Sequence, residues 1–208
     1  MKMNLLSVKR SRRLPVAAIL LFAVLVSGFS QETRLLRQPS LSDSKIAFSY
    51  GADIWIADLN GGSALRLTST PAIESNPHFS PDGSWVAFSS NRSGNNAVYI
   101  VSSGGGDAIR LTWHPSSSKV VGWTPDGKEV VFASTRNTAP SGFNRLWTVP
   151  VKGGPSSLFT SQWATSGAFS PDGDRMIIDR MSRWDPEWRA YRGGQNTPLV
   201  ILNLKDLS

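Results

Sequence analysis

The sequence predicts an all-β fold built from repeats of one small antiparallel sheet, and three observations carry this prediction. A Ser/Thr-Pro-Asp-Gly tetrapeptide occurs three times, at 80–83, 124–127 and 170–173, with its prolines 44 and 46 residues apart. Each copy is followed by a short run of β-branched and aromatic residues. No stretch of the chain has the apolar period of a long helix. A repeat of about 40 to 50 residues is typical of stacked or ring-like sheet repeats.

The tetrapeptide predicts a tight turn. Proline presets φ at the second position of a type I turn, aspartate tolerates the third position, and glycine takes the left-handed conformation at the fourth. We expect Asp82, Asp126 and Asp172 to accept hydrogen bonds from nearby backbone amides. A calcium loop is not predicted, since no alternating series of acidic ligands follows any copy.

The run after each turn is expected to be a strand that is buried on both faces. These runs cover 84–88, 128–132 and 174–178, and 44–48 is a degenerate copy whose turn lacks proline and glycine. Alternate residues of a strand point to opposite faces, and both sets are mostly apolar here. A sheet packed between two neighbouring sheets would have this pattern.

Two more strands complete the repeat. The third strands are expected at 53–57, 97–101, 145–149 and 198–202. Glycine clusters after the first three indicate tight hairpins. More polar fourth strands are expected at 65–68, 109–112 and 157–160. Four antiparallel strands with an amphipathic outermost strand form a blade of a β-propeller.

The blade count predicts an incomplete propeller over residues 36–208. The blades are expected at about 36–70, 71–114, 115–162 and 163–208, and the last one stops after its third strand. Propellers close with about four to eight blades. We therefore expect a partial, open ring of about three to four blades, with an unpaired edge that favours aggregation, from the front of a longer protein.

Residues 1–30 have the pattern of a secretory signal peptide. Five basic side chains and no acidic one accompany an apolar stretch at 16–26, and small residues stand at Gly28 and Ser30. We expect cleavage after Ser30 and export to the periplasm or the medium. An uncleaved membrane anchor is the alternative, although the apolar stretch is shorter than the roughly 20 residues that span a bilayer.

The overall charge gives no reason to expect a nucleic-acid partner. The net charge is +7, but the part after residue 30 has 17 basic and 15 acidic side chains, so most of the excess lies in the leader. The chain has no cysteine, which excludes disulfides and thiolate metal sites.

No catalytic, metal or cofactor site can be identified in the sequence, and we expect none of the three. The two histidines, His78 and His114, have no Gly-x-Ser-x-Gly nucleophile elbow near them, and packing or a surface position is expected for each. The glycine clusters do not join a strand to a helix, so they do not predict a phosphate-binding loop.

One long loop in the last blade is the candidate binding surface. Residues 180–194 separate its second and third strands and are rich in aromatic and arginine side chains. Such loops at blade ends often carry recognition, but the same aromatic side chains could cap the blade core. The candidate binding residues are Trp184, Trp188, Arg189, Tyr191 and Arg192.

The repeat, with Phe-Ser-Pro-Asp-Gly at 79–83 and a closing Arg-Leu-Thr, resembles the TolB-type, WD-repeat-like blade. That blade is shared by TolB, the prolyl-oligopeptidase-type propellers and the tricorn proteases. The stretch 36–48, running into 53–55, resembles the start of the six-bladed tricorn propeller. The insert 188–194, followed by 197–202, is similar to a segment of the same domain.

The resemblance implies a non-catalytic part of a large serine peptidase with two propellers, a PDZ domain and a peptidase core. Its propellers gate substrates or products, so peptides or proteins are the implied partners, and the catalytic residues would lie beyond Ser208. No residue of this chain matches a catalytic role, which leaves open whether it belongs to an enzyme.

Two features depart from the tricorn pattern. The paired arginines that archaeal members use near a substrate's C-terminus have no counterpart at 112–125, where only Lys119 is basic. The leader also differs, since the best-known members are cytosolic. A TolB-like periplasmic protein-binding propeller and the propeller of a prolyl-oligopeptidase-type peptidase remain alternatives.

Overall fold

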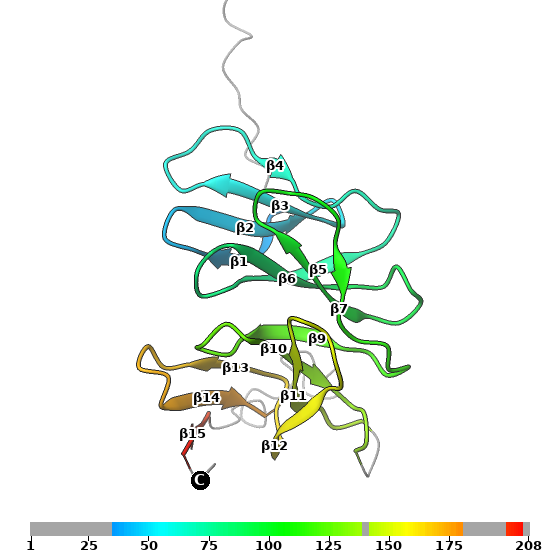
Figure 1. Cartoon of the computed structure of the whole chain (residues 1–208), viewed down its shortest axis with the longest axis vertical. Coiled ribbons are helices and arrows are strands. Elements are labelled where there is room, and N and C mark those ends of the chain that lie inside the picture. The colour runs from blue at the N-terminus through cyan, green and yellow to red at the C-terminus, as the bar shows by residue number, and fades with distance from the viewer. Residues whose placement is uncertain (1–34, 139–141, 181–198, 206–208) are drawn as a thin grey trace, which may run out of the picture. The chain divides into compact units, whose positions relative to one another are not determined.

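All regular elements in the described part of the chain are β-strands. The computed structural model describes residues 35–138, 142–180 and 199–205. The chain divides into two units, 1–34 and 35–208, and every described strand belongs to the second (Figure 1). Within the described ranges, no helix has the length and hydropathy needed to cross a bilayer.

Four antiparallel sheets follow one another along the chain, each with its strands hydrogen-bonded in chain order (Figure 1). Blade 1 consists of β1 (Arg37–Leu41), β2 (Lys45–Tyr50), β3 (Asp53–Asp58) and β4 (Leu65–Arg66). Blade 2 consists of β5 (Glu74–Phe79), β6 (Trp85–Ser90), β7 (Ala97–Ser102) and β8 (Ile109–Arg110). Blade 3 consists of β9 (Lys119–Trp123), β10 (Glu129–Ser134), β11 (Arg145–Pro150) and β12 (Ser157–Trp163). The described strands of blade 4 are β13 (Ser166–Phe169), β14 (Arg175–Asp179) and β15 (Val200–Asn203). This arrangement confirms the predicted all-β propeller, whereas the exact domain boundaries stay a prediction.

The three repeated turns have the predicted geometry. Gly83, Gly127 and Gly173 have φ of 69°, 68° and 74°, in the left-handed region that glycine adopts readily. A Cβ on Gly173 would lie 3.3 Å from Cβ of Pro125, closer than an ordinary contact, so the turns of neighbouring blades also pack closely on one another. Glycine is therefore favoured at this position by both backbone conformation and space.

The turn side chains hold the corner between the first and second strands of a blade. The Ser80 hydroxyl donates to Asp82 Oδ1 and accepts from the Trp85 amide at 2.9 Å, while the Ser84 amide donates to Asp82 at 3.2 Å. Hydrogen bonds from Ser80 and Ser84 lower the pKa of Asp82 to about 2. The predicted role of the turn aspartates as backbone acceptors is confirmed.

Each apolar core lies between two consecutive blades. Alternate residues of β6 serve both sides: Val86 and Phe88 pack toward blade 1, and Ala87 packs toward blade 3. In β10, Val130 and Phe132 pack toward blade 2, and Val131 packs toward blade 4. All six side chains are completely buried. The prediction of strands buried on both faces is confirmed for these two.

The same expectation is wrong for β14. Ile177, which occupies the register position of Ala87 and Val131, is 37% exposed, and its cross-strand partner Ile201 is 61% exposed. No described blade packs against this face, so its apolar side chains remain in contact with water. The local pattern predicts an apolar strand correctly, but burial requires a neighbouring sheet.

We expect Gly167→Ala to destabilise the fold by about 1–3 kcal/mol, because overpacking forces neighbouring atoms to move. A Cβ at this position in β13 would lie 2.7 Å from the backbone oxygen of Ile177 on the paired strand, and as close to Met176 Cε. Urea unfolding followed by tryptophan fluorescence measures the effect. Gly122→Ala in β9 is the matched control, since no atom lies within 4 Å of its added Cβ. Equal unfolding midpoints for the two variants would contradict the close approach.

Candidate functional site at the blade axis

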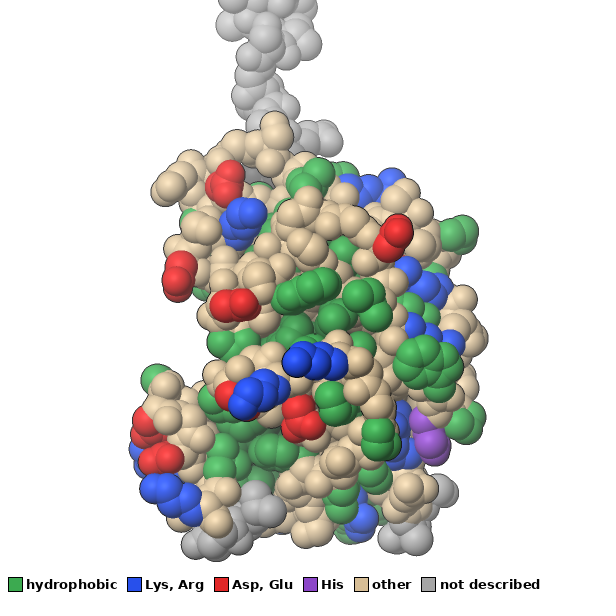
Figure 2. Space-filling view, viewed as in Figure 1, with side chains coloured by type: hydrophobic (Ala, Val, Ile, Leu, Met, Phe, Trp, Pro, Cys, Tyr) green, Lys and Arg blue, Asp and Glu red, His purple; other side chains and the backbone are tan. Residues whose placement is uncertain are grey.

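The first strands of all four blades contribute to one polar pocket of about 790 Å³. Its lining comes mainly from β1, β5, β9 and β13 and from the turns that follow the first two, and Lys45, Val131 and Met176 of the second strands also line it. Figure 2 shows the surface hollowed between the part that holds β1 and β2 and the part that holds β13 and β14. This volume lies within the range of about 300–1,000 Å³ that is typical of ligand pockets.

The backbone around His78 is fixed by neighbouring blades. The register of β5 shifts between Ser75 and His78, and Asn76 has a φ of 53° within this bulge. Gln38 of β1 bonds Asn76 twice, donating from Nε2 at 2.9 Å and accepting from the amide at 2.8 Å. The Trp123 indole of β9 donates to the His78 carbonyl at 2.9 Å. Bulges of this kind commonly redirect a side chain beside a functional site.

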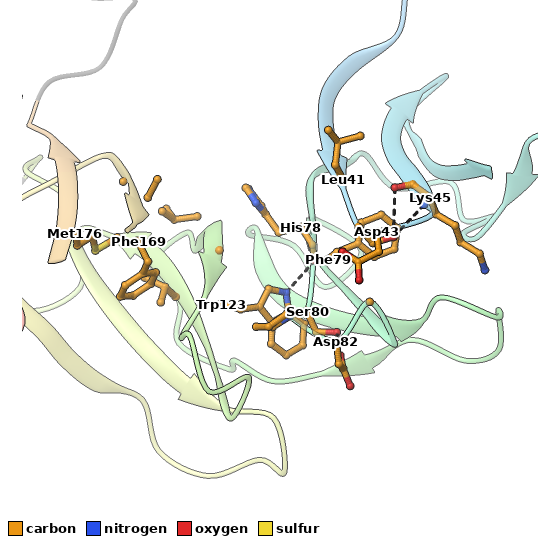
Figure 3. Close-up of a pocket in the computed structure, with 18 of the residues that line it drawn as sticks. Leu41, Asp43, Lys45, His78, Phe79, Ser80, Asp82, Trp123, Phe169 and Met176 are labelled. Carbon is orange, nitrogen blue, oxygen red and sulfur yellow. Dashed lines mark hydrogen bonds between the residues drawn. The ribbon is translucent and has the colours of Figure 1, made fainter. Parts of the chain in front are cut away.

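The His78 side chain projects into the pocket. In Figure 3 its imidazole points into the space between Leu41 and Phe169, while the Lys45 ammonium and the Asp82 carboxylate point away from that space. The register of the sheets places Gly122 and Ala168 at the positions equivalent to His78. The sequence repeat predicts this equivalence, and the small residues at the other two positions leave room around the imidazole.

His78 is neutral at physiological pH. Burial lowers its pKa to about 4, and the positive charge of Lys119 adds to this effect. No described side chain hydrogen-bonds either ring nitrogen. A neutral imidazole has one donor and one acceptor nitrogen, so His78 can exchange hydrogen bonds with an amide group.

The Ser80, His78 and Asp82 side chains do not form a hydrolytic triad, although their residue types suggest one. The Ser80 hydroxyl bonds Asp82 directly and has no hydrogen bond to His78. A nucleophile needs a hydrogen-bonded base that is itself oriented by a third group. Within the described ranges, no group of three His, Asp or Glu residues could hold a metal ion.

The site residues predicted from sequence are placed as follows. Trp184, Trp188, Arg189, Tyr191 and Arg192 lie outside the described residues, so their role stays a prediction. His78, for which only packing or a surface position was expected, lines the axial pocket. The signal that points to it is an ionisable side chain at a repeat position where the other copies have glycine or alanine.

We expect His78 to make folding stability depend on pH between about 4 and 6.5. An unfolded chain binds a proton at His78 near pH 6.5, whereas the folded chain does so only near pH 4. The unfolded state therefore holds more protons in this window, and the free energy of unfolding falls as the pH decreases. Urea unfolding of wild type and His78→Gln at half-unit pH steps measures the slope, which should be smaller in the variant. Identical slopes would show that the ring is freely solvated.

Known proteins with similar sequences place the chain in a family. Residues 33–208 match the family described as the Tricorn protease N-terminal beta propeller domain. Tricorn protease homolog 1 of Streptomyces coelicolor is 35% identical over 175 residues, which cover 80% of this chain and 16% of that protein. The Tol-Pal system protein TolB of Bordetella pertussis is 41% identical over 49 residues, covering 23% of this chain and 11% of that protein.

A solved structure agrees with these matches. The crystal structure of the tricorn protease superposes with a TM-score of 0.68 at 27% identity, over 83% of this chain and 18% of that chain. The described blades thus correspond to a minor part of a much longer protein in both tricorn comparisons. The chain belongs to the family of tricorn protease N-terminal β-propeller domains.

Proposed function

We propose that the chain provides a peptide-binding passage along the blade axis in a tricorn-type proteolytic system and does not cleave peptides itself. The observation that carries this proposal is the axial pocket of about 790 Å³, to which all four blades contribute. The family membership favours a role in proteolysis. Because the chain spans only 16% of the Streptomyces relative, peptidase activity is assigned to a part of the system outside these blades.

The chemistry of the pocket suits a peptide of varied sequence. Phe79, Trp123 and Phe169 supply aromatic surface, and His78 supplies an uncharged donor and acceptor. Aromatic and apolar walls with a few polar groups are typical of ligand pockets. Together with the polar groups that also line the pocket, these side chains can contact both the backbone and the apolar side chains of a peptide.

We further propose that the protein is exported through its leader. The basic and apolar pattern of residues 1–30 supports this. The mature protein isolated from a periplasmic fraction should begin at Gln31 when its N-terminus is sequenced. A cytoplasmic protein that keeps Met1 would contradict export, and a membrane-bound one that keeps it would favour an anchor.

A site-specific photo-crosslinker tests the passage. With p-benzoylphenylalanine in place of His78, the full chain should capture fluorescein-labelled peptides from a casein digest without cleaving them. The matched control carries the same group in place of Ile109, which is 50% exposed on β8 and does not line the axial pocket. Equal capture at both positions, or none at His78, would contradict the passage.

A TolB-like protein-binding propeller is the second candidate. The 41% identity to TolB over 49 residues favours it. In that case, affinity capture from periplasm should recover envelope proteins, and casein peptides should not bind at the axis. A coding sequence that continues into a peptidase core would instead support the tricorn-type proposal.

A further inference from the structure

Blades 2 and 3 contain the same arginine motif but satisfy it differently. In blade 2, Arg92 lies beside Ser90 and forms an ion pair with Glu74, whose side chain is completely buried. The guanidinium lies over the Tyr99 ring, 4.6 Å from its centroid. The Thr70 hydroxyl also donates to Glu74, at 3.0 Å.

The same motif recurs 44 residues later without the carboxylate. Arg136 bonds Ser134 through Nε at 3.2 Å and lies over the Phe132 ring, 4.6 Å from its centroid. Ser118 occupies the position of Glu74, and its hydroxyl accepts from Arg136 Nη2 at 2.7 Å. Arg136 is only 5% exposed and has no ion pair among the described residues. A buried charge without a partner of opposite sign is costly, so this exchange requires an explanation.

A pocket of about 330 Å³ opens beside this guanidinium. It is lined by Arg136, Asn137, His114 and Trp147 together with residues 111–113 and 154–156, and none of its described lining residues is acidic. Trp147 is buried, and its indole N–H has no acceptor among the described residues. By contrast, the equivalent indole of Trp55 in blade 1 donates to the Tyr50 carbonyl at 3.0 Å. The pocket therefore holds a cation without an ion-pair partner, next to a buried indole whose N–H lacks an acceptor among the described residues.

His114 adds a neutral donor. It stands 44 residues after Thr70, which bonds the carboxylate in blade 2. Its Nδ1 accepts from the Ser116 amide at 3.0 Å, so the proton of the neutral ring is on Nε2. Nε2 is then available to donate.

We propose that this pocket binds a carboxylate group from outside the blade, held by the Arg136 guanidinium with the His114 N–H group as a further donor and with Trp147 as a neighbouring wall. The carboxylate takes the place that Glu74 fills internally in blade 2. A carboxylate suits the site because guanidinium and carboxylate form strong charge-assisted hydrogen bonds. The carboxylate belongs either to a small organic acid or to an acidic side chain of a peptide.

An NMR titration of the ¹⁵N-labelled full chain tests the site. Sodium acetate replaces sodium chloride at constant ionic strength, and the Arg136 Nε–H and Trp147 indole signals are followed, with the latter assigned by Trp147→Phe. We expect both signals to shift and to saturate in the millimolar range, while the Arg92 Nε–H does not move. A linear drift of the two signals without saturation would overturn the proposal, and so would equal shifts when the chloride concentration is raised without acetate. Either result in the wild-type protein is sufficient, without any variant.

Ser118→Glu supplies the carboxylate within the chain, as in blade 2. We expect the affinity of this variant for acetate to fall at least tenfold. The Arg136 Nε–H signal should move toward the position of the signal of Arg92, which is paired with Glu74. Arg136→Met should lose the Trp147 response as well. Acetate binding that is unchanged in Ser118→Glu would contradict the site.

The source of the carboxylate is distinguished by a second probe. N-acetyl-glutamate amide, whose only carboxylate is its side chain, is compared with acetate in the same titration. Binding at least tenfold tighter than acetate assigns the site to an acidic peptide side chain, whereas equal or weaker binding assigns it to a small organic acid.

Discussion

Glu74→Ala is expected to lower the free energy of unfolding by about 3–5 kcal/mol, because removing one partner of a buried ion pair leaves the other charge uncompensated. The Glu74 carboxylate is completely buried and accepts from Arg92, Thr70 and Ser90 through a single oxygen, Oε1. All three donors lose their acceptor in the variant. Urea unfolding followed by tryptophan fluorescence measures the loss.

Two controls separate this effect from a general loss of charge. Lys128→Ala removes the exposed pair with Asp126 and should change stability by less than about 1 kcal/mol. Replacing both buried partners with apolar side chains, as Glu74→Met with Arg92→Leu, should recover most of the loss, since Glu74 Oε2 is itself buried without a hydrogen bond. A double variant as unstable as Glu74→Ala would mean that packing, and not unpaired charge, causes the loss.

Phe132→Ala is expected to cost a similar amount, about 3–5 kcal/mol, because it leaves a cavity between blades 2 and 3. The ring is completely buried and packs with side chains of both blades. It also forms the surface on which the Arg136 guanidinium rests. The loss is a large fraction of the roughly 5–15 kcal/mol that stabilises a typical domain.

Phe143→Ala is the matched control for this variant. Phe143 is 40% exposed and stacks on Trp163 with 4.0 Å between the ring centroids. Only the aromatic contact and part of its area are lost, so a change of about 1 kcal/mol is expected. The midpoints of thermal and urea unfolding should therefore differ clearly between the two alanine variants. Similar midpoints would indicate that the interface between blades 2 and 3 collapses to fill the space.

The strands could be predicted because their signals are local. Turn chemistry at 80–83 and its two repeats marks one corner of each blade, and period-two apolar patterns follow it. Ile177 shows that a local pattern predicts a strand but not its burial. Its segment is as apolar as the segments around Ala87 and Val131, yet the Ile177 side chain is exposed. Burial on a given face depends on a sheet that lies about 45 residues away in the chain, and no local pattern encodes it.

The candidate sites depend on contacts that are distant in sequence. The axial pocket joins strands from four blades, and the bulge that holds His78 depends on Gln38, 40 residues earlier. The exchange of Glu74 for Ser118 is visible once the repeats are aligned. Its meaning requires the burial of Arg136, which only the packed structure provides. Repeat alignment can therefore locate such positions, but it cannot say which of them lack a partner.

The confinement of each apolar core to one pair of adjacent blades has a consequence for how the molecule comes apart. As in other repeat proteins, the packing energy is approximately a sum of terms between adjacent blades. An outer blade can therefore detach while the others stay folded. Among the described blades, blade 2 shares a core with a blade on each side, whereas blade 1 shares a core only with blade 2. Amide hydrogens of β6 and β7 should then exchange with solvent more slowly than those of β2 and β3, and fraying would begin at the flanks.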